Sequence, residues 1–117
     1  MRDHTKLKVF AMADALVPEV YTRTRVLPAE ERFGLQSQIR RSALSVPTNI
    51  VEGCTRQTPR DFARFLVIAL GSANEARYLI DVATRVEMLP LSDRDFLDPR
   101  YDELIRALAS FIRTVES

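Results

Sequence analysis

The strongest constraint on the fold is an unbroken helical spacing of apolar residues that begins just after position 58. Thr58, Pro59 and Asp61 are the residue types of a helix start, because a hydroxyl caps the first turn, proline fits it and an acid favours its positive end. Apolar side chains then recur at steps of four and three, the spacing that lines one helix face. This line consists of Phe62, Leu66, Ala69, Ala73, Ala76, Ile80 and Ala83.

A second apolar line runs beside the first in the same segment. It consists of Phe65, Ile68, Ser72, Leu79, Val82 and Val86. Two adjoining lines predict a wide buried face, as in the interior of a helix bundle. A helix over residues 59–87 would be about 43 Å long, and it needs neighbours of similar length to cover it.

Two helical segments precede this helix, one over residues 6–24 and one from position 29 or 33 to about position 56. Each contains an internal proline, Pro18 in the first and Pro47 in the second. We expect each proline to kink its helix, because it removes a backbone donor and crowds the preceding turn.

A fourth helical segment follows the turn at residues 88–91. Ser92 is expected to cap it, and Asp98-Pro99 has the pattern of a second start at which the helix begins again. The connections between the segments are short, which favours antiparallel neighbours. The sequence therefore predicts an all-α fold: a single domain over residues 1–117, folded as an antiparallel up-down-up-down four-helix bundle.

The composition is typical of a soluble globular domain, with 46% apolar and 28% charged residues. No segment approaches the roughly 18 apolar residues that a membrane-spanning helix needs. The first residues lack the apolar stretch of a secretory signal. Cys54 is the single cysteine and cannot form an internal disulfide, which fits a reducing compartment. We therefore expect a cytoplasmic protein without a membrane partner.

Charge is unevenly distributed along the chain. Residues 1–74 hold eleven Lys/Arg against seven Asp/Glu, a net charge of +4, whereas residues 75–117 hold six against nine, a net charge of −3. Fifteen of the seventeen basic residues are arginine. Arginine forms forked bonds to carboxylates and phosphates, so this bias fits fixed ion pairs or phosphate contacts. The alternative is a GC-rich genome that encodes arginine in place of lysine.

A combined motif extends over most of the chain. The second helical segment reads Gly34-Leu35-x-x-Gln38-Ile39-Arg40-Arg41-Ser42-Ala43, followed by Ser45-Val46-Pro47-x-Asn49-Ile50-x-Glu52-Gly53. The motif continues with Arg56, Asp61-Phe62-x-Arg64-Phe65-Leu66-x-Ile68-Ala69 and Gly71-Ser72-Ala73-Asn74-Glu75. Over about residues 7–89 the chain resembles the bacterial four-helix-bundle family named after proteins encoded in intervening sequences of large ribosomal RNA genes.

The resemblance implies a bundle that assembles as a homopentameric ring. It also implies kinship with the accessory proteins of diversity-generating retroelements, which bind a reverse transcriptase. The expected partners are therefore other copies of this chain, together with RNA, DNA or a nucleic-acid-processing protein.

Arg40 and Glu75 are expected to form a structural ion pair. If the second and third helices lie antiparallel, facing residue numbers sum to about 115 or 116, which brings Glu75 near Arg40 and Arg41. Glu75 lies on the second apolar line, so we expect its carboxylate to be partly buried, and a buried carboxylate must be paired. The forked guanidinium of Arg40 is the expected partner.

Asn49 and Glu52 invite both a functional and a structural interpretation. As a site, they would present an amide and a carboxylate beside Gly53. As structure, Glu52 would pair with Arg56 four residues later, and Asn49 would satisfy a carbonyl freed by the proline before it. The structural interpretation is preferred, with Gly53 allowing close packing near the third helix.

Arg56, Arg60 and Arg64 are spaced by four and would share one helix-end face. With Arg41 they are the candidate nucleic-acid-binding residues, and Arg2, Lys6 and Lys8 are expected to lie near this face. The alternative is a solvated face whose arginines pair with nearby acids. In a ring, one modest patch per subunit would repeat around the axis and bind phosphates through multiplicity.

The sequence offers little for catalysis. The single histidine, His4, lies near the terminus, and Cys54 has no recognisable base partner and is expected to pack as a small apolar residue. We therefore expect a non-enzymatic protein without a cofactor or a bound metal. The leading hypothesis is an oligomeric scaffold that binds nucleic acid or a nucleic-acid enzyme. The alternative is a protein-interaction module without a nucleic-acid role, and the remote alternative is a metal- or small-molecule-dependent enzyme.

Overall fold

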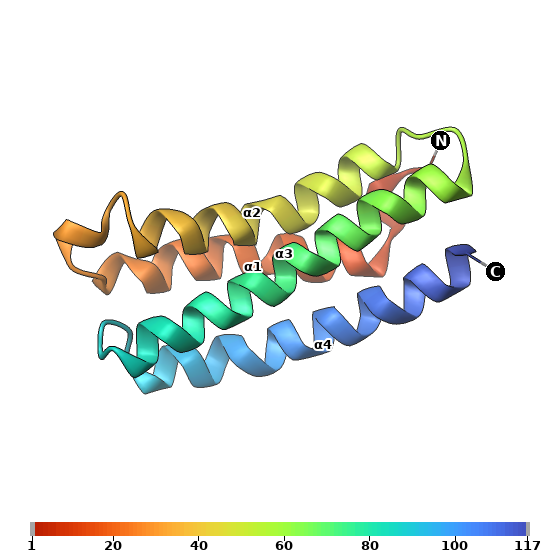
Figure 1. The fold of residues 1–117 in the computed structure, drawn as a ribbon. Helices are drawn as coiled ribbons and strands as arrows, with labels where there is room; N and C mark the ends of the chain where they lie inside the picture. The colour runs from red at the N-terminus through yellow and green to blue at the C-terminus, as the bar shows by residue number, and fades with distance from the viewer. Residues whose placement is uncertain (1, 117) are drawn as a thin grey trace.

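Four long helices pack side by side as a bundle in the computed structural model, which describes residues 2–116 (Figure 1). They are α1 (Lys8–Arg23), α2 (Leu35–Gly53), α3 (Pro59–Arg85) and α4 (Leu91–Glu116). Over the described residues the remaining chain forms short 3-10 helices and turns, and no strand is present. The predicted all-α class is confirmed.

The two ends of the bundle are built from different connections. The α1–α2 connection and the α3–α4 turn lie at one end, on the left in Figure 1. The α2–α3 connection lies at the other end, together with the start of α1 and the end of α4. The longest dimension of the molecule is 43 Å, which equals the length expected for the third helix.

Helix α3 begins as the sequence predicts. The Thr58 hydroxyl accepts a hydrogen bond from the backbone N–H of Asp61 (3.1 Å), and Pro59 occupies the first turn. All seven residues of its first apolar line are buried. The second line was expected to be buried as well, but it is only partly covered, and Ile68 leaves 46% of its surface exposed. One face of α3 therefore fills the core, while the adjoining face borders a groove beside α2.

Small residues bring α2 and α3 close together. A Cβ atom added to Gly53 would lie 2.9 Å from the Cβ of Phe65 and 3.1 Å from the Phe62 ring. Further along the pair, the Ser45 and Ser72 hydroxyls are hydrogen-bonded at 2.8 Å. These contacts lie close to the expected register, in which facing residue numbers sum to about 115 or 116.

The boundaries of α2 and α4 differ from those expected. Helix α2 begins at Leu35, after a 3-10 helix at Ala29–Glu31, and it ends at Gly53 rather than near position 56. Helix α4 begins at Leu91 rather than after Ser92, and it continues through Pro99 without a second start.

An arginine fork contacts α4 on both sides of its proline. The Arg77 guanidinium of α3 contacts both Asp98 carboxylate oxygens, at 2.9 and 3.2 Å, and an Asp102 oxygen at 3.1 Å. These two acids lie on either side of Pro99, so the fork holds both parts of the helix against α3. The hydrogen bonds from Arg77 hold the pKa of the Asp98 carboxyl below its ordinary value.

The two helical glycines should respond to alanine in opposite ways. Gly71→Ala should raise the free energy of unfolding by about 0.5–1 kcal/mol, because an added Cβ meets no atom within 4 Å and alanine favours a helix. Gly53→Ala should lower it by about 1–3 kcal/mol, because its Cβ would force α2 away from α3. Urea denaturation measures both. A Gly53→Ala variant as stable as the wild type would contradict the close approach.

Arg77→Ala should lower the free energy of unfolding by about 0.5–1 kcal/mol at neutral pH, because the fork is partly exposed. In the folded protein the pKa of Asp98 is below its ordinary value of 3.8. The Arg77–Asp98 pair therefore stabilises the fold fully at pH values above 3.8, and this stabilisation is lost as the pH falls through the folded pKa. The difference in the free energy of unfolding between the wild type and Arg77→Ala should therefore become smaller at acidic pH, and urea denaturation at a series of pH values measures it. Arg85→Ala, which removes an exposed pair within α3, is the control and should change the free energy of unfolding much less than Arg77→Ala does.

Candidate functional site

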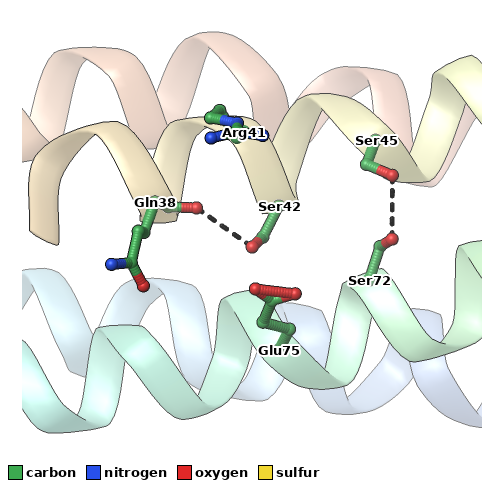
Figure 2. Close-up of a pocket in the computed structure, with 6 residues that line it drawn as sticks. All are labelled: Gln38, Arg41, Ser42, Ser45, Ser72 and Glu75. Atoms are coloured by element: carbon green, nitrogen blue, oxygen red, sulfur yellow. Dashed lines mark hydrogen bonds between the residues drawn. The ribbon is translucent and has the colours of Figure 1, made fainter. Parts of the chain in front are cut away.

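A polar groove lies between α2 and α3. It has a volume of about 510 Å³ and is open to solvent. Its walls are lined by Gln38, Arg41, Ser42, Ser45, Ser72 and Glu75 (Figure 2). The groove exists because the helices meet through small polar side chains here, which reach one another without filling the space between the helix backbones.

Hydrogen bonds fix the serines of the groove. Ser45 bonds to Ser72 across the helices at 2.8 Å, and the Ser42 hydroxyl donates to the Gln38 carbonyl at 3.0 Å. The charged residues remain at the surface, with Arg41 on α2 and the Glu75 carboxylate reaching from α3 toward α2 (Figure 2). Since hydroxyls and carbonyls are the partners of these serines, the groove offers hydrogen bonds and two opposite charges rather than an activated nucleophile.

The expected ion pair between Arg40 and Glu75 does not form, and Glu75 is exposed. Arg40 instead donates from Nε to the Thr24 hydroxyl (3.0 Å) and from Nη2 to the Tyr21 carbonyl (3.0 Å). Successive helical residues point about 100° apart, so Arg40 contacts α1 while Arg41 is exposed at the groove. Arg40 thus satisfies a carbonyl that the last turn of α1 leaves without a helical partner.

Asn49 and Glu52 make structural contacts. Asn49 donates from Nδ2 to the Ser45 carbonyl (2.8 Å) and the Ser45 hydroxyl (2.9 Å). The expected acceptor was a carbonyl freed by Pro47, which would be that of Ala43, so the amide reaches a different carbonyl. The pair between Glu52 and Arg56 forms as predicted, at 2.9 Å.

The candidate basic residues lie on separate surfaces rather than on one helix face. Arg56 belongs to the α2–α3 connection, because α2 ends earlier than expected, and its guanidinium lies 4.5 Å from the Phe65 ring centre. Arg60 and Arg64 belong to α3 and border a hollow of about 770 Å³ near the end of α4. Arg41 borders the groove between α2 and α3.

Basic side chains are concentrated at one end of the bundle. Residues 2–8, 52–64 and 113–116, called the basic end below, hold seven Lys/Arg and four Asp/Glu. Within residues 2–116, the exposed side chains of Lys6, Lys8, Arg60 and Arg64 form no ion pair. Free, exposed cations on neighbouring segments are what a phosphate backbone requires.

The opposite end is acidic and apolar. Residues 19–34 and 81–95, called the apolar end below, hold five Lys/Arg and seven Asp/Glu. Of the eight large apolar side chains exposed within residues 2–116, this end carries four. They are Val26, Phe33, Val86 and Leu91. The helical spacing does not reveal this surface, because three of the residues lie in connections or at a helix start, and Val86, the last residue of the second apolar line, falls just after the end of α3.

Cys54 is buried, as expected of a small apolar side chain. Burial raises the pKa of its thiol, which keeps the sulfur protonated and poorly nucleophilic. The backbone N–H of Arg2 donates to the Cys54 carbonyl (2.9 Å), and the Arg2 guanidinium lies over the Phe62 ring. The first residues therefore fold back over the α2–α3 connection.

Two further observations concern residues 2–116. In this part of the chain, no helix combines the length and the apolar character needed to cross a bilayer. Over the same residues, no three His, Cys, Asp or Glu side chains are grouped so that they could hold a metal ion.

The chain is similar to known proteins over most of its length. Residues 5–110 match the sequence profile of a family described as 23S rRNA-intervening sequence protein. A crystal structure of a protein of unknown function from the S23 ribosomal protein family of Bacteroides thetaiotaomicron has a similar fold. That protein is 27% identical, with a TM-score of 0.82, and the similarity covers 89% of this chain and 97% of that one. None of the proteins with curated descriptions matches the chain. The resemblance indicated by the motif is thus confirmed, and the chain belongs to the 23S rRNA-intervening sequence protein family.

Proposed function

We propose that this protein is a non-enzymatic cytoplasmic scaffold that binds nucleic acid, or a nucleic-acid-processing protein, through its basic end. In this proposal the antiparallel up-down-up-down bundle associates with copies of itself as a ring of five subunits. The observation that carries the proposal is the set of exposed cations without an ion pair at the basic end: Lys6 and Lys8 line one hollow, and Arg60 and Arg64 line another.

The position of Arg60 and Arg64 supports phosphate binding. Both lie in the first two turns of α3, where the helix dipole adds positive potential to their own charge. The hollow that they border is wide and open, which suits an extended backbone better than a small molecule. The acids nearby are fewer than the basic residues, so the local field favours an anion.

Self-association would multiply a weak contact. Two phosphate contacts per subunit bind weakly alone, but a ring presents the same pair repeatedly to one strand or duplex. Each additional neutralised phosphate steepens the dependence of log K on log salt by about 0.9 for duplex DNA. A protein with a net charge of only +1 can therefore bind nucleic acid when its cations are gathered at one end.

The alternative is a protein-interaction module without a nucleic-acid role. The apolar end favours it, because exposed apolar side chains clustered on one surface commonly mark protein contacts. The two functions differ in their dependence on salt and on the basic end.

Replacing Arg60 and Arg64 by glutamate should weaken binding of RNA and DNA oligonucleotides at low salt by at least tenfold and flatten the salt dependence. The fold should survive, since acids are favourable in the first turns of a helix. Fluorescence anisotropy across a salt series measures both effects. Arg25→Glu is the control for each single replacement, because Arg25 is exposed at the apolar end and its replacement changes the net charge by the same amount.

Absence of binding by the wild type at low salt, in a protein that still self-associates, would favour the interaction module. Equal losses in Arg25→Glu and in the α3 variants would contradict a site at the basic end.

A further inference from the structure

The apolar end carries a projecting ring and a hollow as two separate features. Phe33 leaves 88% of its surface exposed, the largest value among the exposed large apolar residues described. The hollow, called the bowl below, has a volume of about 500 Å³. Val26 and Pro28 line it from the α1–α2 connection, and Met88, Pro90 and Leu91 line it from the α3–α4 turn. Phe33 is not part of its wall.

The backbone around Phe33 is held in a defined turn. The Gly34 N–H donates to the Glu31 carbonyl (3.0 Å), and the Leu35 N–H donates to the Glu31 carboxylate (3.0 Å). A Cβ on Gly34 would lie 2.7 Å from that carboxylate oxygen, so glycine leaves room for this cap. Phe33 is thus presented to solvent by a fixed turn, which lowers the entropy lost when the ring becomes buried.

Glu87 lies on the rim of the bowl with an unusual backbone. Its φ is 63°, in the left-handed region that favours glycine. The Glu87 N–H donates to the Thr84 carbonyl (3.0 Å) and the Met88 N–H to the Ala83 carbonyl (2.9 Å), a pattern that closes the end of α3. A charged side chain therefore occupies a position where glycine would be easier to accommodate.

The charges beside the ring and the bowl are complementary. The Arg32 guanidinium lies 5.4 Å from the Phe33 ring centre, and Glu87 lies on the bowl rim. Over residues 2–116 neither Arg32 nor Glu87 forms an ion pair. The projecting cation and the acidic rim thus both lack the partner that the other could supply.

We propose that Phe33 of one protomer enters the bowl of a second copy, where Arg32 meets Glu87 of that copy. The inference rests on the proposed self-association and names the contact that carries it. A buried phenylalanine covers about 150–250 Å², less than the roughly 800 Å² per partner of a stable interface. Phe33 is therefore the central anchor, and the exposed residues around the bowl supply the surrounding contact.

The separation of ring and bowl limits the type of assembly. Each protomer offers one of each, so two copies can pair reciprocally, or Phe33 of one subunit can enter the bowl of the next in a head-to-tail series. The proposed assembly of five subunits requires the second, heterologous arrangement, which closes when the rotation between subunits allows it.

Two variants that disable different halves of the contact test this inference. Phe33→Ala removes the ring and keeps the bowl, whereas Leu91→Arg blocks the bowl with a charge that repels Arg32 and keeps the ring. Each alone should weaken self-association by about 30-fold or more, because an anchor of this kind contributes most of the binding energy. Size-exclusion chromatography with light scattering gives the mass, and circular dichroism checks that each variant is folded. Tyr78→Ala is the control, since Tyr78 is 61% exposed on α3 and lines neither feature.

An equimolar mixture of the two variants should give a 1:1 dimer. Phe33→Ala supplies an intact bowl, Leu91→Arg supplies an intact ring, and only one working contact can form between them. Full-size assembly of Phe33→Ala, or a mixture that stays monomeric, would overturn this contact while leaving wild-type self-association intact. A monomeric wild type at micromolar concentration would instead overturn both the contact and the proposed oligomer.

Discussion

Close packing of α2 against α3 organises the rest of the molecule. The two helices meet at glycine, alanine and serine, so their backbones approach closely and the side chains between them are short. This arrangement aligns the long α3 with the core and leaves the polar groove beside it. Arg40 is not part of this contact and bonds instead to Tyr21 and Thr24 at the end of α1, whereas Arg41 is exposed at the groove. The serines of the groove bond to one another, to the backbone and to the Asn49 amide.

Helical spacing predicted the elements better than their ends. Helix α3 could be assigned from Thr58 to its last turn because capping, proline placement and apolar periodicity all agree there. The end of α2 could not, because beyond Gly53 the backbone changes to i−3 hydrogen bonds, such as Arg56 N–H to the Gly53 carbonyl, and the apolar spacing does not mark that change. Helix α4 continues through Pro99, and an arginine from α3 contacts the acids on either side of it. Local patterns do not contain such tertiary contacts.

The candidate site was predictable only in part for the same reason. The basic residues near the start of α3 were identified from the sequence, and Lys6 and Lys8 were expected near them. The fold brings these segments to the same end of the bundle, but it separates Arg56 from Arg60 and Arg64 because α2 ends at Gly53. The two halves of the sequence have net charges of opposite sign, and so do the two ends of the bundle. Because the basic end and the apolar end lie at opposite ends of the bundle, contacts with phosphates and contacts with apolar surfaces do not compete for the same residues.

The first residues and Cys54 together form a natural reporter. The backbone N–H of Arg2 donates to the carbonyl of this single cysteine, whose thiol is buried and has a raised pKa. A thiol reagent can react with the sulfur only when the packing around it opens. The labelling rate therefore reports the opening of this end of the bundle, without any engineered probe.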